Sequence, residues 1–252
     1  MQNTVVIDCF PESALRYGAR YAIVAVDVIR ATTTIATAVS MGRRCFSVAS
    51  VEAALQVSAR LTNPLLAGEL GGVVPRDFEM GNSPADLALR KDIARPLVLL
   101  SSSGTKLIHL ARAAAATYIG AFRNFEFLAK HLAGRHPRIA VIGAGSRGEF
   151  RREDQMCCAW IAERLMDSGY VAENPDTLAM VKRWRGAAID TILAGASAKY
   201  LMRTGQDRDL DFILSHIADL DWAFALDGGE IVGCTSVEPE LAVTGKYEGL
   251  PQ

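Results

Sequence analysis

Short apolar runs alternate with stretches of helical periodicity between residues 4 and 142, and this alternation restricts the folds open to the chain. The apolar runs are Thr4–Cys9, Tyr21–Val26, Cys45–Val48, Leu65–Ala67, Leu97–Ser101, Thr117–Ile119 and Ile139–Ile142. The helical patterns between them are Thr33–Met41, Val51–Leu61, Pro84–Leu89, Lys106–Ala115 and Phe125–Ala133. Strands that alternate with helices in this way form βαβ units. The sequence therefore predicts an α/β fold with three layers, α/β/α, around a mostly parallel or mixed sheet.

The pattern changes after Asp154. Helical spacing recurs at Gln155–Asp167, Ala187–Leu193 and Asp209–Leu220. Two apolar runs follow, Trp222–Leu226 and Ile231–Cys234, and Asp227-Gly228-Gly229 between them predicts a closing β-hairpin. No Pro-rich or Ser-rich linker divides the chain, so we expect one compact domain over residues 1–252. A weak candidate boundary lies at residues 171–176, which contain Asn174-Pro175.

Composition narrows the classes of function. The 252 residues are 50% hydrophobic, enough for a full core, and 27 Lys and Arg against 28 Asp and Glu give a net charge of -1. No basic field would attract nucleic acid or an anionic membrane, and no apolar stretch approaches the roughly 20 residues of a membrane span. Asp8 interrupts the apolar start, which argues against a signal peptide, so we expect a cytoplasmic location. The five cysteines lack Cys-x-x-Cys spacing, which argues against a zinc site or a disulfide framework.

The stretch Val26 to Thr34 places an acid, a base and three hydroxyls where an apolar run ends. Asp27 is expected to end a strand, and Arg30 with Thr32 and Thr33 to open a helix. Ligands of α/β sheets bind at the carboxyl ends of strands, and helix N-termini attract anions. The stretch is thus a candidate site for a metal ion and a phosphate. The alternative is structural: a threonine caps the helix while Arg30 pairs with Asp27 on the surface.

Three more loops follow apolar runs and carry polar groups. Glu69, within Gly68-Glu69-Leu70-Gly71-Gly72, would suit a hard divalent cation, although an ordinary glycine turn is an equal alternative. Gly81-Asn82-Ser83-Pro84 is explained as a helix start and leaves only Asn82 and the Ser83 hydroxyl for a ligand. In Ser101-Ser102-Ser103-Gly104-Thr105-Lys106, hydroxyls and free N–H groups converge as in phosphate sites, with N-capping as the alternative.

A fourth loop, Gly143-Ala144-Gly145-Ser146-Arg147-Gly148, matches the Gly-x-Gly-x-x-Gly dinucleotide fingerprint. A true fingerprint opens a helix at once and reaches an acidic strand end about 20 residues later. Here the segment 149–154 intervenes before the helix, and residues 163–167 are still helical in pattern. The context therefore excludes a dinucleotide site. The acids Glu153 and Asp154 remain, at a helix N-terminus and able to bind a cation.

Together these pieces resemble the 2-phosphosulfolactate phosphatase family. The resemblance rests on Asp27-Val-Ile-Arg-Ala-Thr-Thr-Thr, Gly68-Glu69 with Gly71-Gly72, Gly81-Asn82-Ser83-Pro84, Ser103-Gly104-Thr105 and Glu153-Asp154, in register from about Asp27 to Cys158. It implies an α/β/α enzyme that uses magnesium to release phosphate from 2-phosphosulfolactate, a step toward coenzyme M. The chain departs from the family pattern at Leu70, at Ser102-Ser103 and at Gly143-Ala144-Gly145. These departures change groups that could hold the sulfonate or carboxylate of the substrate.

Our hypothesis is metal-assisted hydrolysis of a phosphate monoester. Asp27, Glu69 and Asp154, with Glu153 as a fourth candidate, would hold Mg²⁺ through oxygen. The phosphate would bind to Arg30, Thr32, Thr33 and the loop Ser102, Ser103, Gly104 and Thr105, while Asn82 would orient the substrate. The rival hypothesis is an anion-binding or phosphometabolite-binding protein of the same fold without turnover. The expected partner is a small phosphorylated acid, and the sequence leaves open whether the chain forms a homo-oligomer.

Overall fold

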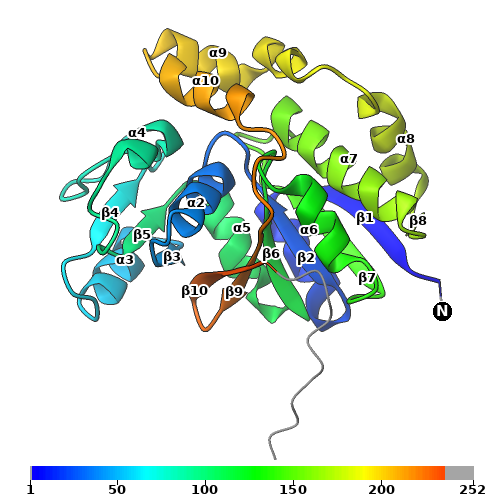
Figure 1. The fold of residues 1–252 in the computed structure, drawn as a ribbon, viewed down its shortest axis with the longest axis horizontal. Helices are drawn as coiled ribbons and strands as arrows, with labels where there is room; N and C mark the ends of the chain where they lie inside the picture. Colours follow the sequence, from blue (N-terminus) through cyan, green and yellow to red (C-terminus); the bar gives the residue numbers. More distant parts are fainter. Residues whose placement is uncertain (1, 236–252) are drawn as a thin grey trace, which may run out of the picture.

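Ten strands form one mixed sheet in the computed structural model, which describes residues 2–235 (Figure 1). The strands are β1 (Thr4–Cys9), β2 (Ala22–Val26), β3 (Cys45–Val48), β4 (Leu65–Gly68), β5 (Leu97–Leu100), β6 (Ala116–Gly120), β7 (Arg138–Gly143), β8 (Val171–Ala172), β9 (Ala223–Asp227) and β10 (Glu230–Cys234). Their order across the sheet is β4-β5-β3-β10-β9-β6-β2-β7-β1-β8. All seven strands expected before residue 143 are present, which confirms the predicted α/β architecture.

The helices cover both faces of this sheet. They are α1 (Ala14–Tyr17), α2 (Ala31–Ser40), α3 (Val51–Ser58), α4 (Pro84–Leu89), α5 (Gly104–Leu110), α6 (Phe125–Leu132), α7 (Arg152–Asp167), α8 (Pro175–Trp184), α9 (Ala196–Arg203) and α10 (Asp207–Ser215). Short 3-10 turns lie at Pro11–Ser13, Gly18–Arg20, Ala111–Ala113 and Ile189–Ala194. Within residues 2–235 no helix is both long and apolar enough to cross a bilayer.

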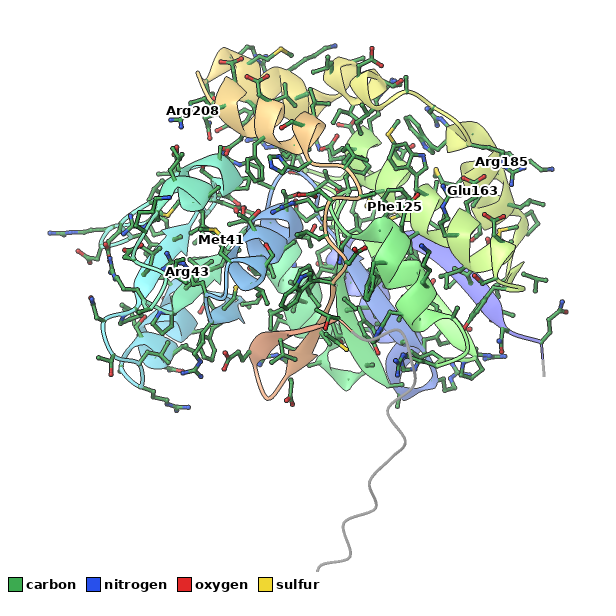
Figure 2. All side chains as sticks on the ribbon, viewed as in Figure 1. Met41, Arg43, Phe125, Glu163, Arg185 and Arg208 are labelled. Carbon is green, nitrogen blue, oxygen red and sulfur yellow. The ribbon has the colours of Figure 1, made fainter. Side chains whose placement is uncertain are left out.

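Three helices escaped the sequence analysis, namely α1, α8 and α9. The Asn174-Pro175 pair, interpreted as a candidate boundary, begins α8 instead, because the Asn174 side chain accepts a hydrogen bond from the Thr177 amide at 2.8 Å and Pro175 occupies the first helical position. Helix α8 packs on α7, where Arg185 and Glu163 pair at 2.5 Å on the outer surface (Figure 2). The helix expected at 187–193 is the 3-10 turn Ile189–Ala194, and α9 follows it.

The predicted closing hairpin exists, and its position is the main feature of the topology. β10 pairs antiparallel with β3, and β9 pairs antiparallel with β6, so the hairpin lies inside the sheet. On one side of it lies the parallel group β4-β5-β3, and on the other the parallel group β6-β2-β7-β1-β8. The last described strands therefore join two halves built from earlier residues.

The core occupies both faces of the sheet, as strand β2 illustrates. Val24 and Val26 belong to the cluster beneath α6 and α7, whereas Ile23 and Ala25 belong to the cluster beneath α2 and α5. All five residues of β2 are buried, as expected for a parallel strand covered on two sides. The first residue after this strand is Asp27, so it is positioned by a strand that is buried on both faces.

Candidate active site

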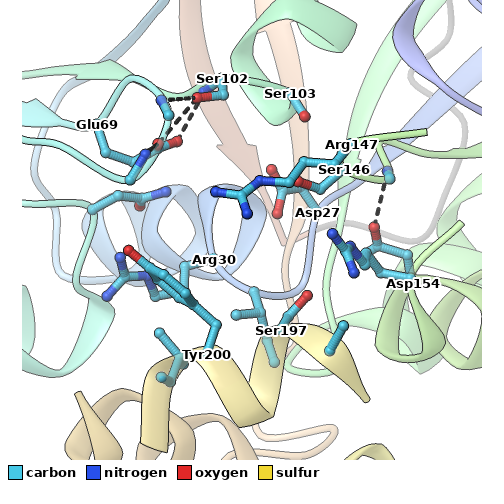
Figure 3. A pocket seen from close by; sticks show the side chains of 18 of the residues that line it. Asp27, Arg30, Glu69, Ser102, Ser103, Ser146, Arg147, Asp154, Ser197 and Tyr200 are labelled. Carbon is cyan, nitrogen blue, oxygen red and sulfur yellow. Dashed lines mark hydrogen bonds between the residues drawn. The ribbon is translucent and has the colours of Figure 1, made fainter. Parts of the chain in front are cut away.

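A pocket of about 380 Å³ opens where the loops after β2, β4, β5 and β7 meet one face of α9 (Figure 3). The loops contribute Asp27, Arg30, Glu69, Ser102, Ser103 and Arg147, the first turn of α7 contributes Asp154, and α9 contributes Ser197, Tyr200 and Arg203. The expectation that these loops converge is therefore correct. Backbone bonds hold two of them together, since the Ala144 amide donates to the Val26 carbonyl at 2.7 Å.

Asp27 forms part of the pocket wall and is only 8% exposed. Backbone amides of Ala31 and Gly104 donate to its carboxylate and favour the charged form. Burial and the nearby charge of Glu69 outweigh them and raise the pKa of Asp27 to about 7. The loop after β5 approaches Asp27 so closely that position 104 must be glycine, because a Cβ atom there would lie 2.3 Å from Asp27 Oδ2. Gly104 is thus placed against the acid rather than in the pocket lining.

Asp154 and Glu153 lie in the first turn of α7. Asp154 accepts hydrogen bonds from the Val28 amide at 2.9 Å and the Gly145 amide at 3.2 Å. Burial, followed by the charges of Asp27 and Glu153, raises the pKa of Asp154. Glu153 is buried outside the pocket lining, and burial raises its pKa as well, partly offset by a hydrogen bond from Ser197. Negative charge is therefore concentrated at one place in the fold.

Glu69 joins two loops of the pocket. Its carboxylate accepts from the Ser102 amide at 2.9 Å, the Ser102 hydroxyl at 3.0 Å and the Gly72 amide at 2.7 Å. The Ser102 hydroxyl in turn accepts from the Gly71 amide at 2.7 Å. The backbone amides of the two glycines after β4 therefore hold Glu69 and Ser102 in place, with Glu69 facing the loop after β5.

Arg30 lines the pocket but does not pair with Asp27, so that part of the structural alternative is wrong. Its Nη1 donates to Asp209 Oδ2 and to Gln206 Oε1, each at 2.5 Å. Asp209 on α10 also accepts from the Ser83 hydroxyl at 2.6 Å and the Ala85 amide at 3.1 Å. Arg30 is thus fixed by α10 and the start of α4.

The threonines predicted to bind phosphate lie below the pocket surface. The Thr32 hydroxyl donates to the Asp27 carbonyl at 2.8 Å, and the Thr33 hydroxyl to the Val28 carbonyl at 2.8 Å. Thr105 likewise donates to the Ser101 carbonyl at 2.8 Å. All three are buried and absent from the lining, because β-branched hydroxyl residues in the first turn of a helix bond readily to the preceding backbone. No threonine side chain caps α2, so the other part of the structural alternative is also wrong.

Asn82 reaches the pocket, and its side-chain oxygen accepts from the Thr34 hydroxyl at 2.7 Å. Ser83 is the N-cap of α4 and accepts from the Asp86 amide at 3.1 Å, with Pro84 next, as predicted. In the loop after β7, helix α7 begins only at Arg152, which agrees with the exclusion of a dinucleotide site.

Comparisons with known proteins agree with this set of loops. The sequence profile of the family described as 2-phosphosulpholactate phosphatase matches residues 9–219. A probable 2-phosphosulfolactate phosphatase of Synechococcus sp. strain JA-2-3B'a(2-13) is 30% identical over 218 residues, which cover 84% of this chain and 89% of that protein. A protein of the same name from Deinococcus radiodurans is 30% identical over 192 residues, covering 74% and 80%. The chain belongs to the 2-phosphosulfolactate phosphatase family.

The part that matches the 2-phosphosulfolactate phosphatase family includes all of the pocket, together with residues that sequence reasoning missed. These are Ser146, Arg147, Arg151, Ser197, Tyr200, Leu201 and Arg203. The first three lie in the loop that was singled out for its glycines and acids, so its arginines were the available signal. The others lie on α9, a helix that the sequence analysis did not predict, and no local motif indicates that they belong to a binding site.

The magnesium site expected from the 2-phosphosulfolactate phosphatase resemblance fits the donor chemistry. Asp27, Glu69 and Asp154 offer only oxygen, the donor that Mg²⁺ prefers, and Oε2 of Glu153 has no hydrogen-bond partner within residues 2–235. A cation would balance the neighbouring negative charges that help to raise the pKa values of Asp27 and Asp154. As the side chains lie, however, no three acidic, histidine or cysteine groups in the described chain form a metal-binding cluster. The magnesium site and its ligands stay predictions.

Proposed function

We propose that the protein is a Mg²⁺-dependent phosphatase that hydrolyses the phosphate ester of a small 2-hydroxy acid, with 2-phosphosulfolactate as the principal candidate. The observation that carries the proposal is the meeting of two buried carboxylates, Asp27 and Asp154, with arginines in one polar pocket. Membership of the family and the names of the relatives, probable 2-phosphosulfolactate phosphatases, support the same reaction.

The chain supplies distinct groups for this reaction. Asp27 and Asp154, with Glu69 opposite, would hold the metal ion, while Ser102, Ser103 and Asn82 would bind or orient the substrate. When bound, Mg²⁺ would neutralise phosphoryl oxygens and lower the pKa of a coordinated water. Arg30 lines the pocket, and its guanidinium is held in a fixed position by Asp209 on α10 and by Gln206, which directly precedes that helix.

The decisive experiment measures inorganic phosphate released from 2-phosphosulfolactate and from other phosphorylated 2-hydroxy acids, with Mg²⁺ varied. Release should depend on Mg²⁺ and stop when a chelator is added. Asp27→Asn should reduce it by about 100-fold or more, because a charge at the reacting centre is lost. Asp167→Asn is the matched control, since this exposed acid at the end of α7 pairs only with Arg164 at 3.4 Å within residues 2–235.

The results separate the alternatives. Release that survives both the chelator and Asp27→Asn would contradict the mechanism. Tight binding of anions without release from any phosphomonoester would instead identify a binding protein of the same fold.

A further inference from the structure

Four arginines line the pocket, and only two of them have an acidic partner within residues 2–235. Arg30 pairs with Asp209 at 2.5 Å, and Arg151 pairs with Glu149. Arg147 and Arg203 form no ion pair in the described part of the chain. The positive charge that remains available to a ligand therefore lies on Arg147 and Arg203, and not on the arginine that the sequence favoured.

Arg147 occupies an unusual backbone position. Ser146 and Glu149 exchange two backbone hydrogen bonds, each 3.0 Å long, around the central residues Arg147 and Gly148. Both central residues have positive φ, 52° and 74°, which is the conformation of a type I′ turn. Glycine, asparagine and aspartate favour its first central position, whereas arginine does so rarely. A long cationic side chain held here in a strained conformation indicates that the side chain itself is required.

The turn is anchored to the acidic side of the pocket. The Gly145 amide donates to Asp154 Oδ2 at 3.2 Å, one residue before the turn begins. From this base Arg147 extends into the middle of the pocket, on the side where Asp27 lies (Figure 3). Both arginines are exposed, but Arg203 lies in the last turn of α9 and not on this turn.

We propose that Arg147 binds the phosphoryl group of the substrate, whereas Arg30 is a positioning residue that joins α10 to the pocket. This inference rests on the proposed function. Bringing a phosphoryl dianion beside Asp27 and Asp154 requires a cation that the protein has not already neutralised. A guanidinium also matches phosphate oxygens with two parallel hydrogen bonds.

The test replaces Arg147 by glycine, which adopts positive φ without strain, so the variant should fold. Titration calorimetry with inorganic phosphate, in buffer containing Mg²⁺, should show at least a tenfold loss of affinity in Arg147→Gly. The thermal midpoint should stay the same or rise, since the turn is relaxed. Arg147→Lys should keep part of the affinity because it keeps the charge.

Arg76→Gly is the matched control. Arg76 is an exposed turn residue outside the pocket lining, has no ion pair within residues 2–235, and carries the same charge. Its substitution should leave phosphate binding unchanged. If Arg147→Gly binds phosphate as tightly as the wild type, or if the wild type binds none, the assignment of Arg147 is wrong. Calorimetry measures phosphate binding and does not require turnover. A protein without phosphatase activity would therefore contradict the proposed function, but the effect of Arg147→Gly on phosphate affinity could still be measured.

Discussion

Asp27 and Asp154 illustrate how single residues in this pocket oppose the stability of the fold. Each is buried, each accepts backbone hydrogen bonds that favour its charge, and each still has a raised pKa. Burial of a carboxylate near other carboxylates costs free energy unless a cation balances it. Buried carboxylates with raised pKa values are typical of functional sites, where groups that lower the stability of the fold are kept because they take part in binding or catalysis.

The raised pKa of Asp27 predicts how the stability of the metal-free protein varies with pH. Its pKa is about 7 in the folded chain and 3.8 in its ordinary state, so the folded state holds the proton more tightly. The penalty is absent below about pH 4 and complete above about pH 7, so stability should fall as pH rises through this window. Thermal unfolding in chelator should show the fall.

Asp27→Asn should flatten this profile and raise stability at pH 8 by at most about 4 kcal/mol, because each of the roughly three units by which the pKa is raised corresponds to about 1.4 kcal/mol. Added Mg²⁺ should stabilise the wild type more than the variant. Equal pH profiles for the two proteins would show that Asp27 does not carry the penalty.

At the scale of elements, α10 connects the pocket to α4 through the hydrogen bonds of one side chain. Its residue Asp209 is buried and accepts from Arg30, Ser83 and Ala85, which belong to two other parts of the chain. The side chains of Arg30 and Asp209 are only 11% and 4% exposed. Removal of one partner from such a pair leaves an uncompensated buried charge.

Asp209→Ala should therefore destabilise the protein by about 3–5 kcal/mol and lower phosphate release, because Arg30 loses its fixed position. Asp211→Ala, at an exposed position on the same helix, should change stability by less than about 0.5 kcal/mol. Urea unfolding of both variants measures the difference. Similar losses in the two would mean that Arg30 is not held by Asp209.

At the scale of the whole molecule, the hairpin β9–β10 joins two parallel groups of strands. Phe224 on β9 is fully buried, pairs with Ile119 of β6 in register, and stands opposite Gly233 of β10. The two groups make their sheet pairing through this hairpin. We predict one cooperative unit rather than two domains.

Phe224→Ala should lower the free energy of unfolding by about 3–5 kcal/mol through lost burial and a cavity. Hydrogen exchange should then accelerate together in β5 and in β2, on both sides of the hairpin. Faster exchange in only one of these strands would reveal two units that unfold separately.

The local sequence predicted much of this architecture. Seven strands and several helices followed from apolar periodicity, because burial on one or two faces imposes a repeat that neighbouring residues display. The N-cap of α4 and the closing hairpin turn could also be predicted from the sequence, because each depends on residues only a few positions apart. Loop composition, together with the resemblance to the 2-phosphosulfolactate phosphatase family, predicted that Asp27, Glu69, Ser102 and Asp154 belong to one site, and all four line one pocket.

Only the tertiary structure decided which of these groups face the pocket and which are already occupied. Thr32 and Thr33 satisfy their own backbone, and Arg30 is bound to Asp209, a residue 179 positions away. Arg147 has no acidic partner in the described chain and reaches the pocket through a turn anchored on Asp154. The sequence by itself determined most helices and strands and the residue types at their ends, because these depend on neighbours along the chain. The pairing of charges depends on distances through space, which the fold alone sets.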